Sequence, residues 1–393
     1  MPGSNADKSS AASLSDKYDT WLPTCATSRP ASTGKRVAIV GAGPAGIATA
    51  LTLTARGISN CIVEARLEPT RKLGEAIPPN AKPLLKKLGI LHLVDGPEHI
   101  AYYGNKSCWG TNKLEQSEFI QDIHGHGYLL DRLQFEKQLR KHAMDKGCIL
   151  IVGFKLKKTF RTKQGIEVLI DNGTTTESLA AKYIVDATGR KASVSHQLGM
   201  TKHSLDSQFA VVCKAVLPTP MEHQIMVEAT KNGWWYMAPQ NETELTLMFF
   251  TQKELLPHKS EMESLIRKEL GTSLHLSKIM SSASLDFDKL KVMPAGTSRL
   301  DVSYGGHWIA VGDAAFSFDP ISSYGITSAL ASGYYAGHAL SSKLANEDDA
   351  MLAYGYVVEN AFQAYMEKLW SHYQQETRWE GSTYWENRFS TTI

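Results

Sequence analysis

Cysteine is scarce in this chain of 393 residues, which holds only five. They are scattered without a Cys-x-x-Cys pair, at Cys25, Cys61, Cys108, Cys148 and Cys213. An odd, dispersed set does not suit a disulfide framework or a zinc site, whereas it suits reduced thiols in a cytoplasmic protein. The cysteines therefore predict a cytoplasmic location and no metal centre.

An excess of charge of either sign is also lacking. Lys and Arg total 42 and Asp and Glu total 40, which gives a net charge of +2. A chain so close to neutrality has no general attraction to nucleic acid or to an anionic membrane. We therefore expect neither as a partner.

Long apolar runs are lacking too, with one stretch that needs explanation. Residues 37–55 carry no charge over 19 positions, which approaches the length of a membrane span. Three glycines and Pro44 interrupt the stretch, so a buried strand, a tight turn and a helix explain it better. Residues 1–34 are rich in serine and small polar residues, without the apolar core of a signal peptide, and are expected to form a disordered tail.

The interrupted stretch begins a βαβ unit. Residues 36–40 read as a strand, 45–56 as a helix and 61–64 as a second strand. The turn between the first strand and the helix is Gly-Ala-Gly-Pro-Ala-Gly over residues 41–46, whose glycines permit a tight turn and a close approach to a pyrophosphate. Glu64 closes the second strand 18 residues after Gly46, where a carboxylate can bind a ribose diol. This context predicts a dinucleotide site.

Two later turns fit the same cofactor. Asp186-Ala-Thr-Gly189 follows a buried strand, although an Asp-headed turn alone has an equally good structural explanation. Gly312-Asp313 follows another buried strand, and Asp313 can accept a hydrogen bond from a ribityl hydroxyl. Gly325 lies where a helix is expected to begin, so that backbone N–H groups there can face a flavin pyrimidine and favour its anionic reduced form.

The order of these three turns resembles the flavoprotein monooxygenases with the hydroxybenzoate-hydroxylase-type fold. In that family an FAD domain carries an inserted substrate sheet, and Arg132 matches the arginine that reaches toward the FAD phosphates. The resemblance implies noncovalent FAD. A second Gly-x-Gly-x-x-Gly turn is absent from the sequence, so no separate nicotinamide domain is expected, and the source of reducing electrons stays open.

A narrower resemblance rests on four segments that occur together: residues 74–79, 233–239, 319–326 and 376–385. It is to the LodB/GoxB-like flavoproteins that mature tryptophylquinone oxidases, a group similar to the tryptophan halogenases. It implies an FAD-dependent monooxygenase in which reduced flavin and O₂ oxygenate a tryptophan of a partner protein, the precursor of an amine or amino-acid oxidase. A flavin-stabilised chaperone that holds a self-oxidising precursor is the alternative without oxygenase chemistry.

A halogenase is the other alternative. Tryptophan halogenases carry a Trp-x-Trp-x-Ile-Pro signature, and here Tyr236 and Ala238 replace two of its four fixed residues. The nearest candidate for their relay lysine is Lys106, which has no recognisable motif around it and reads better as a surface charge. These departures favour oxygenation.

From residue 207 to residue 252 the pattern changes to consecutive strands, at 209–217, 225–229, 234–238 and 245–251. Without helices between them they predict an antiparallel sheet. We therefore predict an α/β protein with a discontinuous Rossmann-type FAD-binding domain, an inserted, mostly antiparallel β-sheet substrate domain and a C-terminal helix. The expected divisions are 1–34 (tail), 35–200 and 296–345 (FAD-binding domain), 201–295 (substrate domain) and 346–393 (C-terminal helix and aromatic tail).

The predicted site combines the three turns, Arg132 and the residues around them. Cofactor binding is assigned to Gly41, Gly43, Pro44, Ala45, Gly46, Glu64, Ala65, Arg66, Ala76, Arg132, Asp186, Ala187, Thr188, Gly189, Asp313, Pro320, Ser323, Gly325 and Ile326. Glu75, Trp234 and Tyr236 are the catalytic candidates, and strand alternation places Trp234 and Tyr236 on one face with Trp235 on the other. The tail aromatics, Trp370, Tyr373, Trp379, Tyr384, Trp385 and Phe389, either dock the partner or seal the FAD domain.

Overall fold

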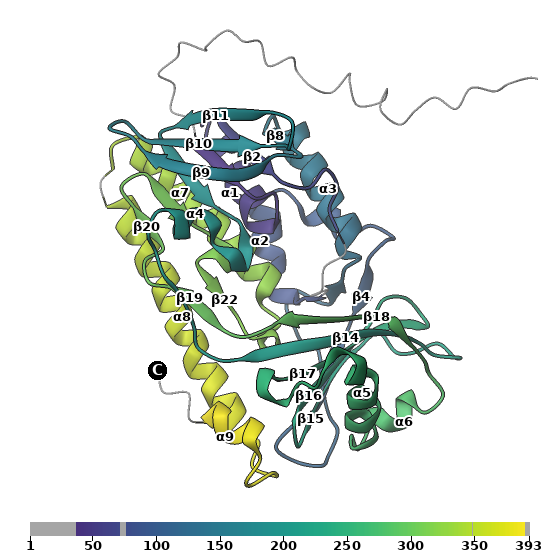
Figure 1. Ribbon diagram of the computed structural model, residues 1–393. Coiled ribbons are helices and arrows are strands. Elements are labelled where there is room, and N and C mark those ends of the chain that lie inside the picture. Colours follow the sequence, from purple (N-terminus) through teal and green to yellow (C-terminus); the bar gives the residue numbers. More distant parts are fainter. Residues whose placement is uncertain (1–36, 71–75, 348, 390–393) are drawn as a thin grey trace, which may run out of the picture. The chain divides into compact units, whose positions relative to one another are not determined.

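The structure is a computed structural model that describes residues 37–70, 76–347 and 349–389 (Figure 1). Its central sheet has the strand order β20-β21-β12-β1-β2-β8. The strands are β20 (Tyr304–Gly305), β21 (Trp308–Ala310), β12 (Tyr183–Asp186), β1 (Val37–Val40), β2 (Asn60–Glu64) and β8 (Ile149–Val152). All pairings are parallel except that of β20 with β21. The predicted doubly wound sheet is confirmed.

Helices α1 (Pro44–Ala55) and α7 (Gly325–Leu344) pack closely together against this sheet (Figure 1). Small residues make the approach possible, because a Cβ atom at Gly333 would lie 2.2 Å from the Ala45 carbonyl oxygen. The expected helix starts after the glycine turn and at Gly325 are thus both present. The first turn of α1 therefore packs against the middle of α7, at Gly333.

The second large sheet has seven strands in the order β18-β14-β17-β16-β15-β5-β6. They are β18 (Ser284–Pro294), β14 (Gln208–Val216), β17 (Glu244–Gln252), β16 (Gly233–Pro239), β15 (Ile225–Thr230), β5 (Gly104–Cys108) and β6 (Glu115–Glu118). The four predicted strands are present and the pairings are antiparallel, except that β15 runs parallel to β5. Strands β5 and β6 belong to this sheet, although residues 35–200 were predicted to form the first part of the other domain. The domain boundaries stay a prediction.

Strand alternation in β16 is as expected. Trp234 and Tyr236 belong to the large core shared with the central sheet. Trp235 faces the other way, into a smaller core with helices α5 (Met262–Gly271) and α6 (Leu276–Met280). The sheet therefore turns one apolar face toward the central sheet and its surroundings, and its own helices cover the other face.

The remaining elements connect or cover these two sheets. Small sheets are formed by β9 (Lys155–Arg161), β10 (Ile166–Asp171) and β11 (Thr176–Ala181), by β3 (Ala76–Ile77), β7 (Gly127–Leu129) and β4 (Ile100–Tyr102), and by β13 (Lys202–Ser204), β19 (Ser298–Leu300) and β22 (Phe316–Ser317). The other helices are α2 (Lys82–Lys87), α3 (Arg132–Asp145), α4 (Ser193–Gln197), α8 (Ala350–Gln374) and α9 (Thr383–Phe389). Among the described residues, no helix is both long enough and apolar enough to cross a membrane.

Candidate active site

A cavity of about 860 Å³ opens where β1, β2, β12 and β21 end. Its wall includes Gly43 after β1, Glu64 at the end of β2, Thr188 after β12 and Asp313 after β21. The carboxyl ends of parallel strands are the usual ligand site of this kind of sheet, and the volume suits a large organic ligand. The three turns predicted from the sequence are therefore brought together.

The three glycines of the first turn differ in what an added Cβ atom would meet. Gly41 has a φ of +112°, and a Cβ there would lie 2.2 Å from the Ala187 carbonyl oxygen. A Cβ at Gly46 would lie 2.0 Å from the Gly41 carbonyl oxygen. A Cβ at Gly43 would meet no protein atom within 4 Å, and Gly43 lines the cavity. The chain thus leaves open space at the one glycine where a pyrophosphate would approach.

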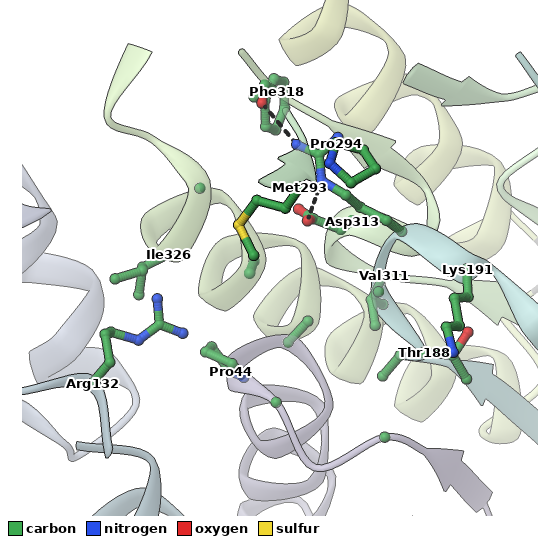
Figure 2. A pocket seen from close by; sticks show the side chains of 18 of the residues that line it. Pro44, Arg132, Thr188, Lys191, Met293, Pro294, Val311, Asp313, Phe318 and Ile326 are labelled. Carbon is green, nitrogen blue, oxygen red and sulfur yellow. Dashed lines mark hydrogen bonds and ion pairs between the residues drawn. The ribbon is translucent and has the colours of Figure 1, made fainter. Parts of the chain in front are cut away.

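Helix α1 begins directly behind that glycine. Its N-cap, Gly43, offers no side-chain hydrogen bond, so the first N–H groups of the helix are left for a ligand. Aligned N–H groups and the helix dipole favour an anion here. Arg132 and Ile326 approach the cavity beside Pro44 (Figure 2), and the Arg132 guanidinium forms a buried ion pair with Glu136 at 2.7 Å. This end of the cavity suits phosphate groups.

Glu64 is held in a defined orientation at the end of β2. Its Oε2 accepts a hydrogen bond from the Ala42 N–H at 2.9 Å, and its Oε1 accepts one from the Arg66 N–H at 2.9 Å. Arg140 Nη2 lies 3.4 Å from Oε2. A carboxylate oxygen can accept more than one hydrogen bond, so Glu64 retains capacity for a ribose diol.

Asp186 shapes the second turn without lining the cavity. It is fully buried, and its Oδ1 accepts hydrogen bonds from the N–H and the hydroxyl of Thr188. Its Oδ2 accepts hydrogen bonds from the N–H and the hydroxyl of Ser195. These bonds bring Ala187, Thr188 and Gly189 to the wall, so the role of Asp186 is to build the turn.

The third turn is held by two cations that the predicted site did not include. Arg190 Nε lies 3.6 Å from Asp313 Oδ2, and Arg190 also donates to the Gly296 carbonyl at 2.6 Å. Lys202 Nζ donates to the carbonyl oxygens of Asp313 and Arg190. Burial lowers the pKa of Lys202 to about 8, against the opposing effect of Asp313. Arg190 stands in the predicted second turn, whereas an isolated lysine such as Lys202 gives no signal in the sequence.

The part of the cavity wall formed by the seven-stranded sheet is apolar and aromatic. Tyr236 on β16 lines it, together with Met248 and Phe250 from the paired strand β17 and Met293 from β18. The alternation of β17 could have identified Met248 and Phe250, because they pair with Tyr236 and Trp234.

Trp234 stands behind this wall. Its ring stacks on Phe250 with centroids 4.0 Å apart, and its Nε1 donates to the Tyr373 hydroxyl at 3.1 Å. It is fully buried, so the structure gives it a supporting position and not a place in the cavity. Glu75 lies outside the described residues.

Most of the predicted residues meet at the cavity wall. These are Gly41, Gly43, Pro44, Ala45, Glu64, Ala65, Arg66, Ala76, Arg132, Ala187, Thr188, Gly189, Tyr236, Asp313, Pro320, Ser323, Gly325 and Ile326. Gly46, Asp186 and Trp234 support the wall from behind, for the packing reasons given above.

This fold and this site define an FAD-dependent oxidoreductase. The sequence profile of the FAD binding domain matches residues 35–364, so the chain belongs to that family. It is 27% identical to LodB of Marinomonas mediterranea, named as an FAD-dependent oxidoreductase, over 89% of this chain and 95% of that protein.

Two solved structures share the fold. The flavin-dependent halogenase CmlS has a TM-score of 0.83 and 21% identity, and the match covers 92% of this chain and 68% of that one. The peptidyl tryptophan dihydroxylase QhpG, essential for tryptophylquinone cofactor biogenesis, has a TM-score of 0.70 and 22% identity, and the match covers 90% and 78%. The open space at Gly43, the N-terminus of α1 and the oriented carboxylate of Glu64 fit the FAD that this family binds.

Proposed function

We propose that this protein is an FAD-dependent monooxygenase that oxidises a tryptophan side chain of a partner protein, the precursor of a tryptophylquinone amine or amino-acid oxidase. The observation that carries the proposal is the match to LodB over nearly the full length of both chains, taken with the four segments that resemble the flavoproteins of tryptophylquinone maturation. The likeness to a peptidyl tryptophan dihydroxylase supports the same substrate.

Different parts of the cavity wall would bind the cofactor and the substrate. The glycine turn, Arg132 and Glu64 would hold the phosphates and ribose of FAD. Tyr236, Met248 and Phe250 would hold a flat, electron-rich ring and exclude water from it, because apolar and aromatic walls bind such rings. Bound FAD supplies the redox chemistry, the reduction of O₂ and the transfer of one of its oxygen atoms.

A single-turnover experiment tests the proposal. Protein with reduced FAD is mixed with O₂ and the precursor oxidase, and the precursor peptides are then weighed for added oxygen. We expect oxygen on the target tryptophan in an amount set by the reduced flavin. Oxygen that appears equally when the bound FAD is left oxidised would instead support the chaperone alternative.

Lys106, the candidate relay lysine of the halogenase alternative, is not part of the cavity wall. Lys106 lies on β5 and pairs with Glu222 at 2.5 Å, and it is absent from the residues that line the cavity. We therefore expect no chlorinated or brominated tryptophan when the reduced protein receives halide, O₂ and free tryptophan. Halogenated product in stoichiometric yield would reverse the ranking.

A further inference from the structure

The last helix of the described chain reaches the loop that closes the cavity. Arg388 lies in α9 and is buried. Its Nη1 lies 3.0 Å from Asp206 Oδ2, and its Nη2 lies 3.1 Å from Asp319 Oδ2. The guanidinium also stacks over the ring of Tyr373, 4.7 Å from its centroid. One side chain from the C-terminal segment thus joins two buried carboxylates.

Asp319 is saturated by donors. Its Oδ2 accepts hydrogen bonds from the Tyr373 hydroxyl at 3.0 Å and from Gln208 Nε2 at 3.1 Å, besides the bond from Arg388. Its Oδ1 accepts a hydrogen bond from the Ile321 N–H at 2.9 Å. A fully buried carboxylate with four donors is not available to act as a base toward a substrate. Its role must lie in the loop that it organises.

That loop is strained where it meets the cavity. Pro320 and Ser323 line the wall, and Ser323 has a φ of +53°. Left-handed backbone in a residue other than glycine persists only where its surroundings fix it. The fixing bonds come from Asp319, whose carboxylate accepts the Ile321 N–H and whose carbonyl accepts the Ser322 N–H and hydroxyl. Gly325 and α7 begin directly after this turn.

We propose that Arg388 is a positioning residue for FAD. By holding Asp319, it fixes the turn 320–323 against the cavity, so that the C-terminal helix sets the affinity and the reduction potential of the flavin. The inference depends on FAD binding and is independent of the proposed tryptophan chemistry.

The chemistry of the cluster explains why an arginine is required. Burial raises the pKa of Asp319, and the Arg388 guanidinium opposes that rise. A guanidinium can bridge two carboxylates and stack on an aromatic ring, whereas a lysine ammonium is a single point charge. Arg388→Lys therefore keeps an ion pair with only one of the two carboxylates, and Arg388→Met leaves both carboxylates without this cation.

The test compares the dissociation constant of FAD in Arg388→Lys, Arg388→Met and Asp319→Asn. Asp319→Asn keeps the shape of the side chain, so it remains informative if the Arg388 variants fold poorly. We expect each variant to bind FAD at least about tenfold more weakly. Asp319→Asn removes one of the two negative charges beside Arg388 and should raise the flavin midpoint potential, and Arg388→Met, which removes the positive charge between the two carboxylates, should lower it.

Arg378→Lys is the matched control. Arg378 belongs to the same C-terminal segment and pairs with the buried carboxylate of Glu376 at 2.6 Å, but it does not line the cavity or touch Asp319. It should lower the unfolding temperature without changing FAD affinity. A merely structural Arg388 would lower the unfolding temperature equally with and without FAD, at an unchanged dissociation constant. That result in Arg388→Lys and Asp319→Asn would overturn the proposal.

Discussion

Substitution of Gly43 tests whether the first glycine turn binds the pyrophosphate of FAD. Because a Cβ there meets no protein atom within 4 Å, the side chain of Gly43→Asp fits the protein itself and opposes only the pyrophosphate. We expect Gly43→Asp to purify without flavin and Gly43→Ala to bind FAD at least about tenfold more weakly, roughly 1.4 kcal/mol. Fluorescence titration with FAD measures both.

The control for that turn is Gly271→Ala. A Cβ atom at Gly271 would also meet no atom within 4 Å, and the residue lies at the end of α5, outside the cavity wall. It should bind FAD normally. Full flavin content in Gly43→Asp would show that the pyrophosphate does not lie at this turn.

Lys202 makes a prediction about pH. Its pKa is about 8 in the folded protein against an ordinary value of 10.5. Between these values the unfolded chain binds more protons than the folded one, so the free energy of unfolding rises with pH. The contribution is lost as the pH falls through about 8, and it amounts to at most about 3 kcal/mol.

Lys202→Met should therefore lack the rise in stability that the wild-type protein shows between pH 8 and 10.5. Urea unfolding at several pH values, at equal saturation with FAD, measures the difference. Lys278→Met, an exposed position on α6, serves as the control and should follow the wild type. An unchanged pH profile in Lys202→Met would mean that the lysine is not buried as a cation.

At the scale of elements, the C-terminal segment can be assigned a role. Tyr384 and Trp385 are buried, and the Trp385 Nε1 donates to the Thr230 carbonyl at 2.9 Å. Trp379 stacks on Trp385 with centroids 5.7 Å apart. Of the two interpretations of the aromatic tail, these contacts support sealing over docking, but the surface that Trp385 covers belongs to β15 of the seven-stranded sheet, whereas sealing of the FAD domain was expected.

Deletion of residues 381–393 should consequently release FAD or cause aggregation, because it uncovers the aromatic cluster and removes Arg388. Flavin content and the unfolding temperature measure the effect. Trp370→Ser is the control, since Trp370 is 46% exposed and should be neutral in both measurements. A truncated protein that stays stable and saturated with flavin would return the tail to a docking role.

Local patterns predicted the elements better than they predicted their neighbours. The charge-free stretch before Ala55 and the alternation around Trp235 each reflect the burial of a short segment, which periodicity records. The parallel pairing of β5 with β15 joins segments about 120 residues apart, and no local pattern encodes it. The same limit explains Asp319 and Arg388, whose partnership depends on the folded path of the whole chain.

At the scale of the whole molecule, the proposed function requires a surface on which a protein substrate docks. Of the tail aromatics first considered for docking, Tyr373, Tyr384 and Trp385 are buried, whereas Trp370 is 46% exposed. The most exposed large apolar side chains among the described residues are instead Ile123 at 92% and Ile120 at 87%. Single exposed apolar side chains are ordinary, and only contiguous apolar surface marks an interaction site, so these two isoleucines, three positions apart, are a candidate docking site that binding experiments test.

Two hydrogen bonds link the loop of these isoleucines to the edge of the cavity, one made by Lys82 at the start of α2 and one by Asn80 just before it. Lys82 Nζ donates to the carbonyl of His124 at 2.8 Å, next to Ile123. Asn80 Nδ2 donates to the Tyr324 hydroxyl at 3.4 Å. Tyr324 is 45% exposed and stands between Ser323 and Gly325, which line the cavity. The segment that carries the isoleucines is thus linked by hydrogen bonds, through Lys82 and Asn80, to the segment that forms the wall at Ser323 and Gly325.

If the protein oxidises a partner-borne tryptophan, the double variant Ile120→Ser/Ile123→Ser should bind the precursor oxidase at least about tenfold more weakly, since apolar contacts at the centre of an interface carry much of its affinity. Its FAD content and unfolding temperature should match the wild type, because both side chains are exposed. Leu352→Ser/Tyr356→Ser provides the control, with exposed apolar residues on α8 at 61% and 70%. Titration of the labelled precursor measures all three proteins. Equal affinity in both double variants would place the docking face elsewhere, and loss only in the α8 variant would place it on that helix.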